Sequence, residues 1–115
     1  MTPPEAIGRM EGVLIAGSRP QRNNNPGDIE YGPFAQAHGA TGGDPRFAIF
    51  PTMEMGYAAL VALLKTPGYY NLTWEAAINR YAPPVENATV NYVHLTCEWL
   101  GCQPTDLVST LMEGL

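Results

Sequence analysis

Charged residues, and basic ones above all, are scarce in this 115-residue sequence. Charged side chains make up 15% of the chain, against about 25% in typical soluble domains. Lys and Arg number 6 against 11 Asp and Glu, which gives a net charge of −5. A nucleic-acid binder needs a basic face that neutralises phosphates, so we expect no nucleic-acid partner.

Long hydrophobic runs are also missing. The longest apolar run, residues 57–64, is far shorter than the about 20 residues of a membrane-spanning helix, so we expect no membrane insertion. The first residues include Glu5 and Arg9 and do not form a secretory signal. Work outside the cytoplasm would therefore need other export machinery, a virion, or a longer parent protein.

Cysteine is nearly absent. Cys97 and Cys102 are too few for a disulfide scaffold, and we expect a free, packed pair unless an oxidising compartment bridges it. A metal site needs more ligands than the nearby His94 supplies, so we expect no metal and no cofactor.

Glycine and proline are abundant, with 12 and 11 residues. They predict short elements joined by stiff turns, and the 45% hydrophobic share is ordinary for a globular chain. The length suits one hydrophobic core. We expect a single domain over residues 1–115.

The first segment has the pattern of a helix. Thr2 is a cap, and two prolines suit the first turn. Ile7, Glu11 and Leu14 then fall on one helical face, and we expect the helix to end near residues 16–17.

Four more helices are predicted further along the chain. Apolar stripes and end signals predict them over residues 53–64, 74–81 and from 87 or 89 to 100. The last is capped by Thr105 and runs through Leu111.

One small hairpin completes the predicted fold. Residues 29–31 and 46–50 are its expected strands, with a flexible loop over residues 38–45. The sequence therefore predicts an α+β fold, mainly α, with a small β-hairpin after the first helix.

Glu11 is an unusual member of an apolar helix face. Burial beside Ile7 and Leu14 would raise the pKa of its carboxyl, which suits a general acid near neutral pH. The alternative is a carboxylate at the edge of the stripe, paired with Arg9, Arg19 or Arg22.

Two polar turns are candidate binding segments. In the run from Asn23 to Gly27, three asparagines favour a tight structural turn, but Asn24 and Asn25 have amides that suit sugar hydroxyl and acetamido groups. In residues 81–89, Glu86 and Asn87 either cap the next helix or form a groove wall, and Tyr81 either packs or lines that groove.

Four segments, in this order, resemble the lysozyme-like superfamily over roughly residues 5–100. They are Ile7-Gly-Arg-Met-Glu11-Gly12, Asn23-Asn-Asn-Pro-Gly-Asp-Ile29, Phe47-Ala-Ile-Phe-Pro-Thr52 with Gly56-Tyr-Ala-Ala-Leu60, and Tyr81-Ala-Pro-Pro with Glu86, Asn87 and Tyr92. The last group resembles the Tyr-Ala turn beside the cleft in bacterial glucosaminidases and phage muralytic domains.

The resemblance implies cleavage of the β-1,4 bond between N-acetylmuramic acid and N-acetylglucosamine. Glu11 would protonate the glycosidic oxygen, with Tyr81 near the developing charge. In a hydrolase a second carboxylate acts with it, whereas a lytic transglycosylase uses one Glu, and both outcomes stay open. The implied substrate-binding residues are Asn24, Asn25, Asp28, Glu30, Glu86, Asn87 and Tyr92, and the candidates for the second carboxylate are Asp28, Glu30, Asp44 and Glu86.

The resemblance also implies a partner and a place of action. The partner would be peptidoglycan glycan strands, at the bacterial cell wall or periplasm, and we expect a monomer. The main alternative is a non-catalytic lysozyme-like protein that binds glycan or builds a virion. A helix-turn-helix over residues 73–100 is disfavoured by its Pro-Pro turn and by the acidic pI of about 4.8.

Overall fold

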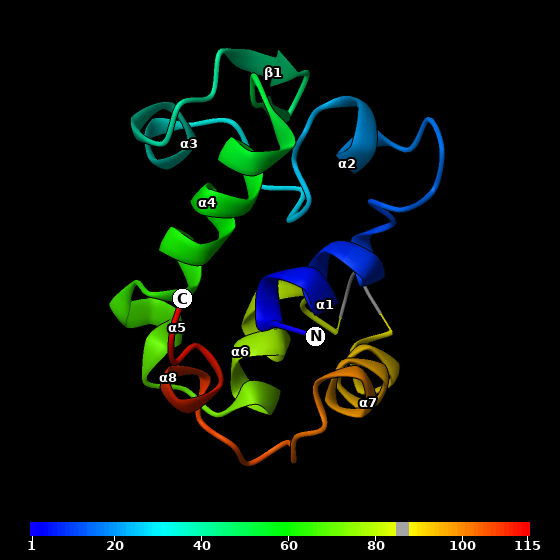
Figure 1. The fold of residues 1–115 in the computed structure, drawn as a ribbon, viewed down its shortest axis with the longest axis vertical. Helices are drawn as coiled ribbons and strands as arrows, with labels where there is room; N and C mark the ends of the chain where they lie inside the picture. Colours follow the sequence, from blue (N-terminus) through cyan, green and yellow to red (C-terminus); the bar gives the residue numbers. More distant parts are fainter. Residues whose placement is uncertain (85–87) are drawn as a thin grey trace.

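The computed structural model describes residues 1–84 and 88–115 (Figure 1). Its elements, in chain order, are α1 (Pro3–Glu11), α2 (Arg19–Arg22), α3 (Pro33–Ala37), β1 (Gly42–Asp44), β2 (Phe47–Ile49), α4 (Met53–Leu64), α5 (Pro67–Tyr70), α6 (Trp74–Tyr81), α7 (Thr89–Leu100) and α8 (Val108–Leu111). Over these residues the protein is a compact, mainly helical α+β fold that measures 36 × 25 × 25 Å, which confirms the predicted class.

Helix α1 begins as predicted and ends earlier. Thr2 and Glu5 form a reciprocal capping box at its start. Gly12 takes a left-handed conformation, with φ 95°, and stops the helix directly after Glu11. The predicted end near residues 16–17 is therefore wrong. Leu14 lies beyond the helix with 74% of its surface exposed, so it is not part of the buried face.

The hairpin is formed by different residues from those expected. β1 pairs with β2 in antiparallel register, with Gly43 opposite Ala48. Residues 29–31 contribute only an isolated bridge between Glu30 and Phe47 on the other side of β2. The predicted loop over 38–45 thus contains a strand, because the Gly-Gly-Asp of β1 is held by pairing with β2 and has no strand pattern of its own.

Helices α4, α6 and α7 confirm the apolar spacing. Thr73 caps α6 through its hydroxyl, and Gly101, with φ 67°, ends α7. The fully buried Trp74 donates its indole N–H to the Thr96 hydroxyl at 2.8 Å, which joins α6 to α7. Helix α8 starts at Val108, later than a Thr105 cap would place it.

Helix α4 runs through the middle of the molecule (Figure 1). It connects the end that carries α2, α3 and the hairpin to the end that carries α5 and α8. Helix α1 lies against α4, and α7 lies on the other side of α1 and α6. Gly56 of α4 approaches the asparagine turn so closely that a Cβ there would lie 1.9 Å from the Asn24 carbonyl oxygen. Within the described residues, no helix is long and apolar enough to cross a bilayer.

Candidate active site

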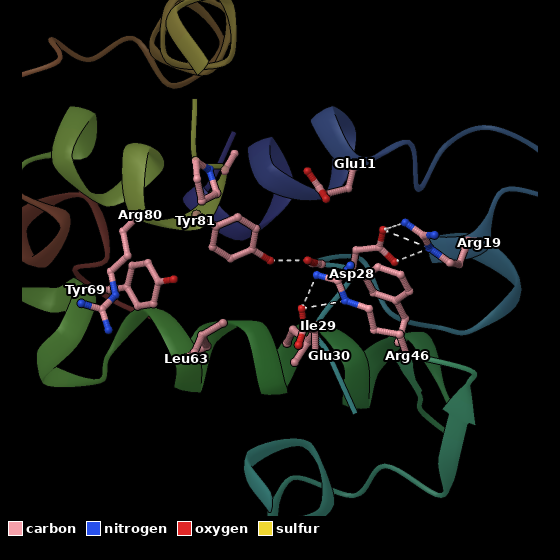
Figure 2. Close-up of a pocket in the computed structure, with 14 residues that line it drawn as sticks. Glu11, Arg19, Asp28, Ile29, Glu30, Arg46, Leu63, Tyr69, Arg80 and Tyr81 are labelled. Carbon is pink, nitrogen blue, oxygen red and sulfur yellow. Dashed lines mark hydrogen bonds and ion pairs between the residues drawn. The ribbon is translucent and has the colours of Figure 1, made fainter. Parts of the chain in front are cut away.

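A groove of about 700 Å³ opens between α1 and α6 on one side and residues 27–30, β2 and α4 on the other (Figure 2). Its uncharged lining includes Gly27, Ile29, Phe47, Leu63, Tyr69 and Tyr81. Its charged lining residues are Glu11, Arg19, Asp28, Glu30, Arg46 and Arg80. The sequence-predicted Glu11, Asp28, Glu30 and Tyr81 therefore meet in one groove.

Glu11 is the last residue of α1, and its carboxyl points into this groove (Figure 2). Burial raises the pKa of Glu11 from its ordinary value near 4.5 to about 7. A hydrogen bond from Tyr92 and the positive charge of Arg19 act in the opposite direction, while the negative charge of Asp28 adds to the increase. The carboxyl is therefore substantially protonated at neutral pH.

Tyr92 of α7 positions this acid. Its hydroxyl donates a hydrogen bond of 3.1 Å to Glu11 Oε2, and the side chain is only 4% exposed. Burial raises the pKa of Tyr92 well above 10, so it remains a phenol that donates its proton. Tyr92, which was predicted to bind substrate, does not line the groove and contacts Glu11.

Asp28 faces the groove as one half of an ion pair. It has a left-handed backbone with φ 51°, and its side chain is 8% exposed. Both of its carboxylate oxygens accept from the Arg19 guanidinium, at 2.5 to 3.2 Å. The same guanidinium lies 3.6 Å from the centre of the Phe47 ring. This contact joins α2, the asparagine turn and β2 at one edge of the groove.

Glu30 is paired as well, but in water. Its Oε1 accepts from Arg46 Nε at 2.9 Å and from Nη2 at 2.5 Å, and both side chains are 61% exposed. Among the carboxylates that the structure places in the groove, Glu11 is thus the one without an arginine hydrogen-bonded to it.

The alternative of a simple ion pair for Glu11 is not what the structure shows. Arg9 lies over the Trp99 ring at 4.2 Å, and Arg22 pairs with Asp44 at 3.1 Å. Arg19 pairs with Asp28, so its effect on Glu11 is only electrostatic.

Tyr81, the last residue of α6, spans the groove floor (Figure 2). Its hydroxyl donates to the Gly27 carbonyl oxygen across the groove. A Cβ at Gly27 would lie 2.6 Å from that hydroxyl, so glycine is needed there. Burial raises the pKa of Tyr81 well above 10, so its hydroxyl stays protonated, donates this hydrogen bond and does not act as a base.

The asparagine turn supports the groove from behind. Asn25 is fully buried, and its amide nitrogen donates to the carbonyls of Ile29 and Ala48 at 2.9 and 3.0 Å, while its oxygen accepts from Ile29 N–H. Asn24 donates to the carbonyls of Phe50 and Pro51. Asn24 and Asn25, which were predicted to contact sugar, do not line the groove, and their amides bond to the backbone around it.

The predicted site residues and the groove-lining residues differ in two respects. Glu86 and Asn87 were predicted to bind substrate, but they lie outside the described residues. Tyr69 and Arg80 line the groove and were not predicted. Arg80 directly precedes the Tyr81-Ala-Pro-Pro segment, and this position is the feature of the sequence that could have indicated Arg80 as a groove residue.

The described residues contain no group of His, Cys, Asp and Glu side chains placed to hold a metal ion. No protein-family model matches the chain, and a comparison with curated proteins gives no match. The chemistry must therefore be inferred from the groove itself. It presents one buried carboxyl near neutral pKa, a phenol that orients this carboxyl, and two arginine-compensated carboxylates.

Proposed function

We propose that this protein is a lysozyme-like domain that cleaves peptidoglycan glycan strands at the β-1,4 bonds between N-acetylmuramic acid and N-acetylglucosamine. The protonated carboxyl of Glu11 acts as the general acid. The order of elements supports this: an acid ends the first helix, an asparagine turn and a hairpin follow, and a long helix forms the opposite wall of the groove.

The observation that carries the proposal is the environment of Glu11. A carboxyl with pKa about 7 in an open groove of about 700 Å³ has both the proton and the space that a glycosidic oxygen needs. A buried carboxyl lowers the stability of the folded chain once it ionises, and a purely structural site gains nothing from it.

Two residues of the chain take part in the proton transfer, Glu11 as the proton donor and Tyr92 as its hydrogen-bond partner. Glu11 gives its proton to the glycosidic oxygen as the bond to the anomeric carbon breaks, and becomes a carboxylate. The Tyr92 hydroxyl already donates to Oε2, and this hydrogen bond strengthens as the charge develops. Tyr92 therefore stabilises the product state of the transfer.

The ion pairs of the groove favour a route with one catalytic carboxylate. Both carboxylate oxygens of Asp28 accept from Arg19, and Oε1 of Glu30 accepts from Arg46, so each of the two possible second carboxylates is engaged by an arginine. In this route with one catalytic carboxylate, the Glu11 carboxylate takes the proton of the muramic 6-hydroxyl as this hydroxyl attacks the anomeric carbon. The product is a 1,6-anhydro sugar, and Glu11 regains its proton.

Digestion of purified sacculi by wild type and by Glu11→Gln tests the proposal. The variant keeps the shape of the side chain and removes its proton donor, so we expect activity to fall at least about 1,000-fold while the fold is kept. Glu98→Gln, at an exposed position of α7, is the matched control and keeps full activity. Wild-type turnover by Glu11→Gln would refute the assignment.

Mass spectrometry of the released fragments identifies the route. We expect 1,6-anhydro-muramic ends, and reducing ends would show hydrolysis with water as the acceptor. If the wild-type chain binds sacculi and releases no fragments, the proposed function changes from catalysis to glycan binding.

A further inference from the structure

The two ends of the groove differ in charge. At one end, Asp28 and Glu30 are compensated by Arg19 and Arg46 (Figure 2). At the other end lies Arg80, and none of the described carboxylates is ion-paired with it. Although the chain has a net charge of −5, Arg80 thus lines the groove without an ion pair to any carboxylate in residues 1–84 and 88–115.

Aromatic and backbone contacts hold Arg80 in place. Its guanidinium carbon lies 5.3 Å from the centre of the Tyr69 ring, in a cation–π arrangement. A Cβ at Gly68 would lie 3.1 Å from Nη2, so the guanidinium also packs against the α5 backbone. The Tyr69 ring in turn meets the Tyr81 ring edge-on at 6.1 Å between centres. Arg80 is therefore an oriented cation beside the groove floor.

We propose that Arg80 and Tyr69 form a subsite for a carboxylate-bearing substituent of the glycan strand. This rests on the proposed function, because it assigns a chemical group of that substrate to one end of the groove. Arginine presents a planar donor fork that matches a carboxylate, and the Tyr69 ring holds that fork in place. In peptidoglycan the carboxylate has two sources, the lactyl group of a peptide-free muramic acid and the stem peptide.

Binding to three probes tests the subsite and separates the sources. The probes are N-acetylglucosamine oligomers without carboxylates, peptide-free glycan strands with lactyl carboxylates, and strands with intact stem peptides. Calorimetry uses the Glu11→Gln chain, so that no strand is cut. We expect this chain to bind at least one carboxylate-bearing probe about 10-fold more tightly than the neutral oligomer.

Adding Arg80→Gln should abolish that preference, and adding Arg80→Lys should keep part of it. Arg9→Gln is the matched control, because Arg9 also lies over an aromatic ring, Trp99, but outside the groove. It should leave the preference unchanged.

Equal weakening of all three probes by Arg80→Gln, or no weakening of any, would overturn the subsite. Digestion of sacculi by the otherwise wild-type chain is measured in parallel. Cleavage without an Arg80-dependent preference refutes only the subsite, and a preference without cleavage refutes only the catalytic function.

Discussion

At the scale of single residues, the chemistry of the groove depends on how few contacts Glu11 makes. Burial dominates its pKa, and Tyr92 donates the one hydrogen bond that the structure gives its carboxyl within the described residues. Burial of the carboxyl should affect stability, and the hydrogen bond from Tyr92 should affect kinetics. Each effect is tested by a substitution that keeps the shape of the side chain.

Glu11→Gln should stabilise the fold in a pH-dependent way. Between pH 4.5 and 7 the unfolded chain loses the Glu11 proton while the folded chain keeps it, so wild-type stability falls as pH rises through this window. The variant does not titrate there. We expect equal stability at pH 4 and an advantage of about 3 kcal/mol for the variant at pH 8, measured by urea unfolding. A constant difference across this range would contradict the raised pKa.

Tyr92→Phe should move the pH dependence of cleavage. The activity of an acid with pKa about 7 falls above that pH, and loss of the Tyr92 hydrogen bond raises the pKa further. We expect the alkaline limb of kcat/KM to shift upward by about one pH unit. Tyr70→Phe, which removes a hydroxyl from a residue that does not line the groove, should leave the limb in place.

At the scale of elements, the asparagine turn and the hairpin form one unit. Asn25 substitutes for missing backbone pairing by bonding both to Ile29 in its own segment and to Ala48 in β2. Left-handed backbone at Asn24 and Asp28 turns the chain on either side of it. The turn therefore fixes where Asp28 faces the groove.

Asn25→Ala should lower the free energy of unfolding by about 3 kcal/mol, because it leaves the Ile29 N–H without its partner in a buried site and removes one hydrogen bond from each of the Ile29 and Ala48 carbonyls. The Ile29 carbonyl still accepts from the Ala48 N–H. Asn24→Ala, where the amide is only partly buried, should cost less. Urea midpoints of the two variants measure the difference. A smaller loss for Asn25 than for Asn24 would contradict the structural role.

Local sequence patterns predict the helices that are long enough to show apolar periodicity and that have residues typical of helix ends. Helices α4, α6 and α7 have eight or more residues and recurring apolar positions. Helices α2, α3 and α5 have four or five residues that begin at or next to a proline, too few for any periodicity, and were not predicted. The predicted first helix runs to residues 16–17 because the apolar spacing continues past Gly12 to Leu14, whereas the left-handed conformation of Gly12 ends the helix.

At the scale of the whole molecule, α4 and the asparagine turn together build one wall of the groove. Gly56 touches the Asn24 carbonyl, and a Cβ there would also lie 2.8 Å from Pro26. Asp28 and the hairpin are continuous with this turn. The close approach of one helix to one turn thus holds together the wall of the groove that faces Glu11.

Gly56→Ala should force α4 away from the asparagine turn. An ordinary helix position would gain about 1 kcal/mol from this change, whereas here we expect a loss of about 2 kcal/mol and lower activity. Thermal unfolding and sacculus digestion report the two effects. A more stable variant would contradict the close approach.

The candidate site could be predicted only as far as local sequence reaches. Glu11 was identified because a carboxyl on an apolar helix face is unusual within a few residues of chain. Its partner Tyr92 lies 81 residues away, and the Asp28–Arg19 and Glu30–Arg46 pairs depend on how segments pack. The same holds for Arg80, whose place beside Tyr69 follows from the angle between α5 and α6.

The contact between α1 and α7 has a consequence during synthesis. On the ribosome, Glu11 emerges before Tyr92, so a nascent chain has an ordinary, water-exposed glutamate until α7 joins α1. A premature stop codon before α7 would leave an intact acid side chain of common acidity. The raised pKa of Glu11 would thus be acquired only after α7 has been synthesised and has packed against α1.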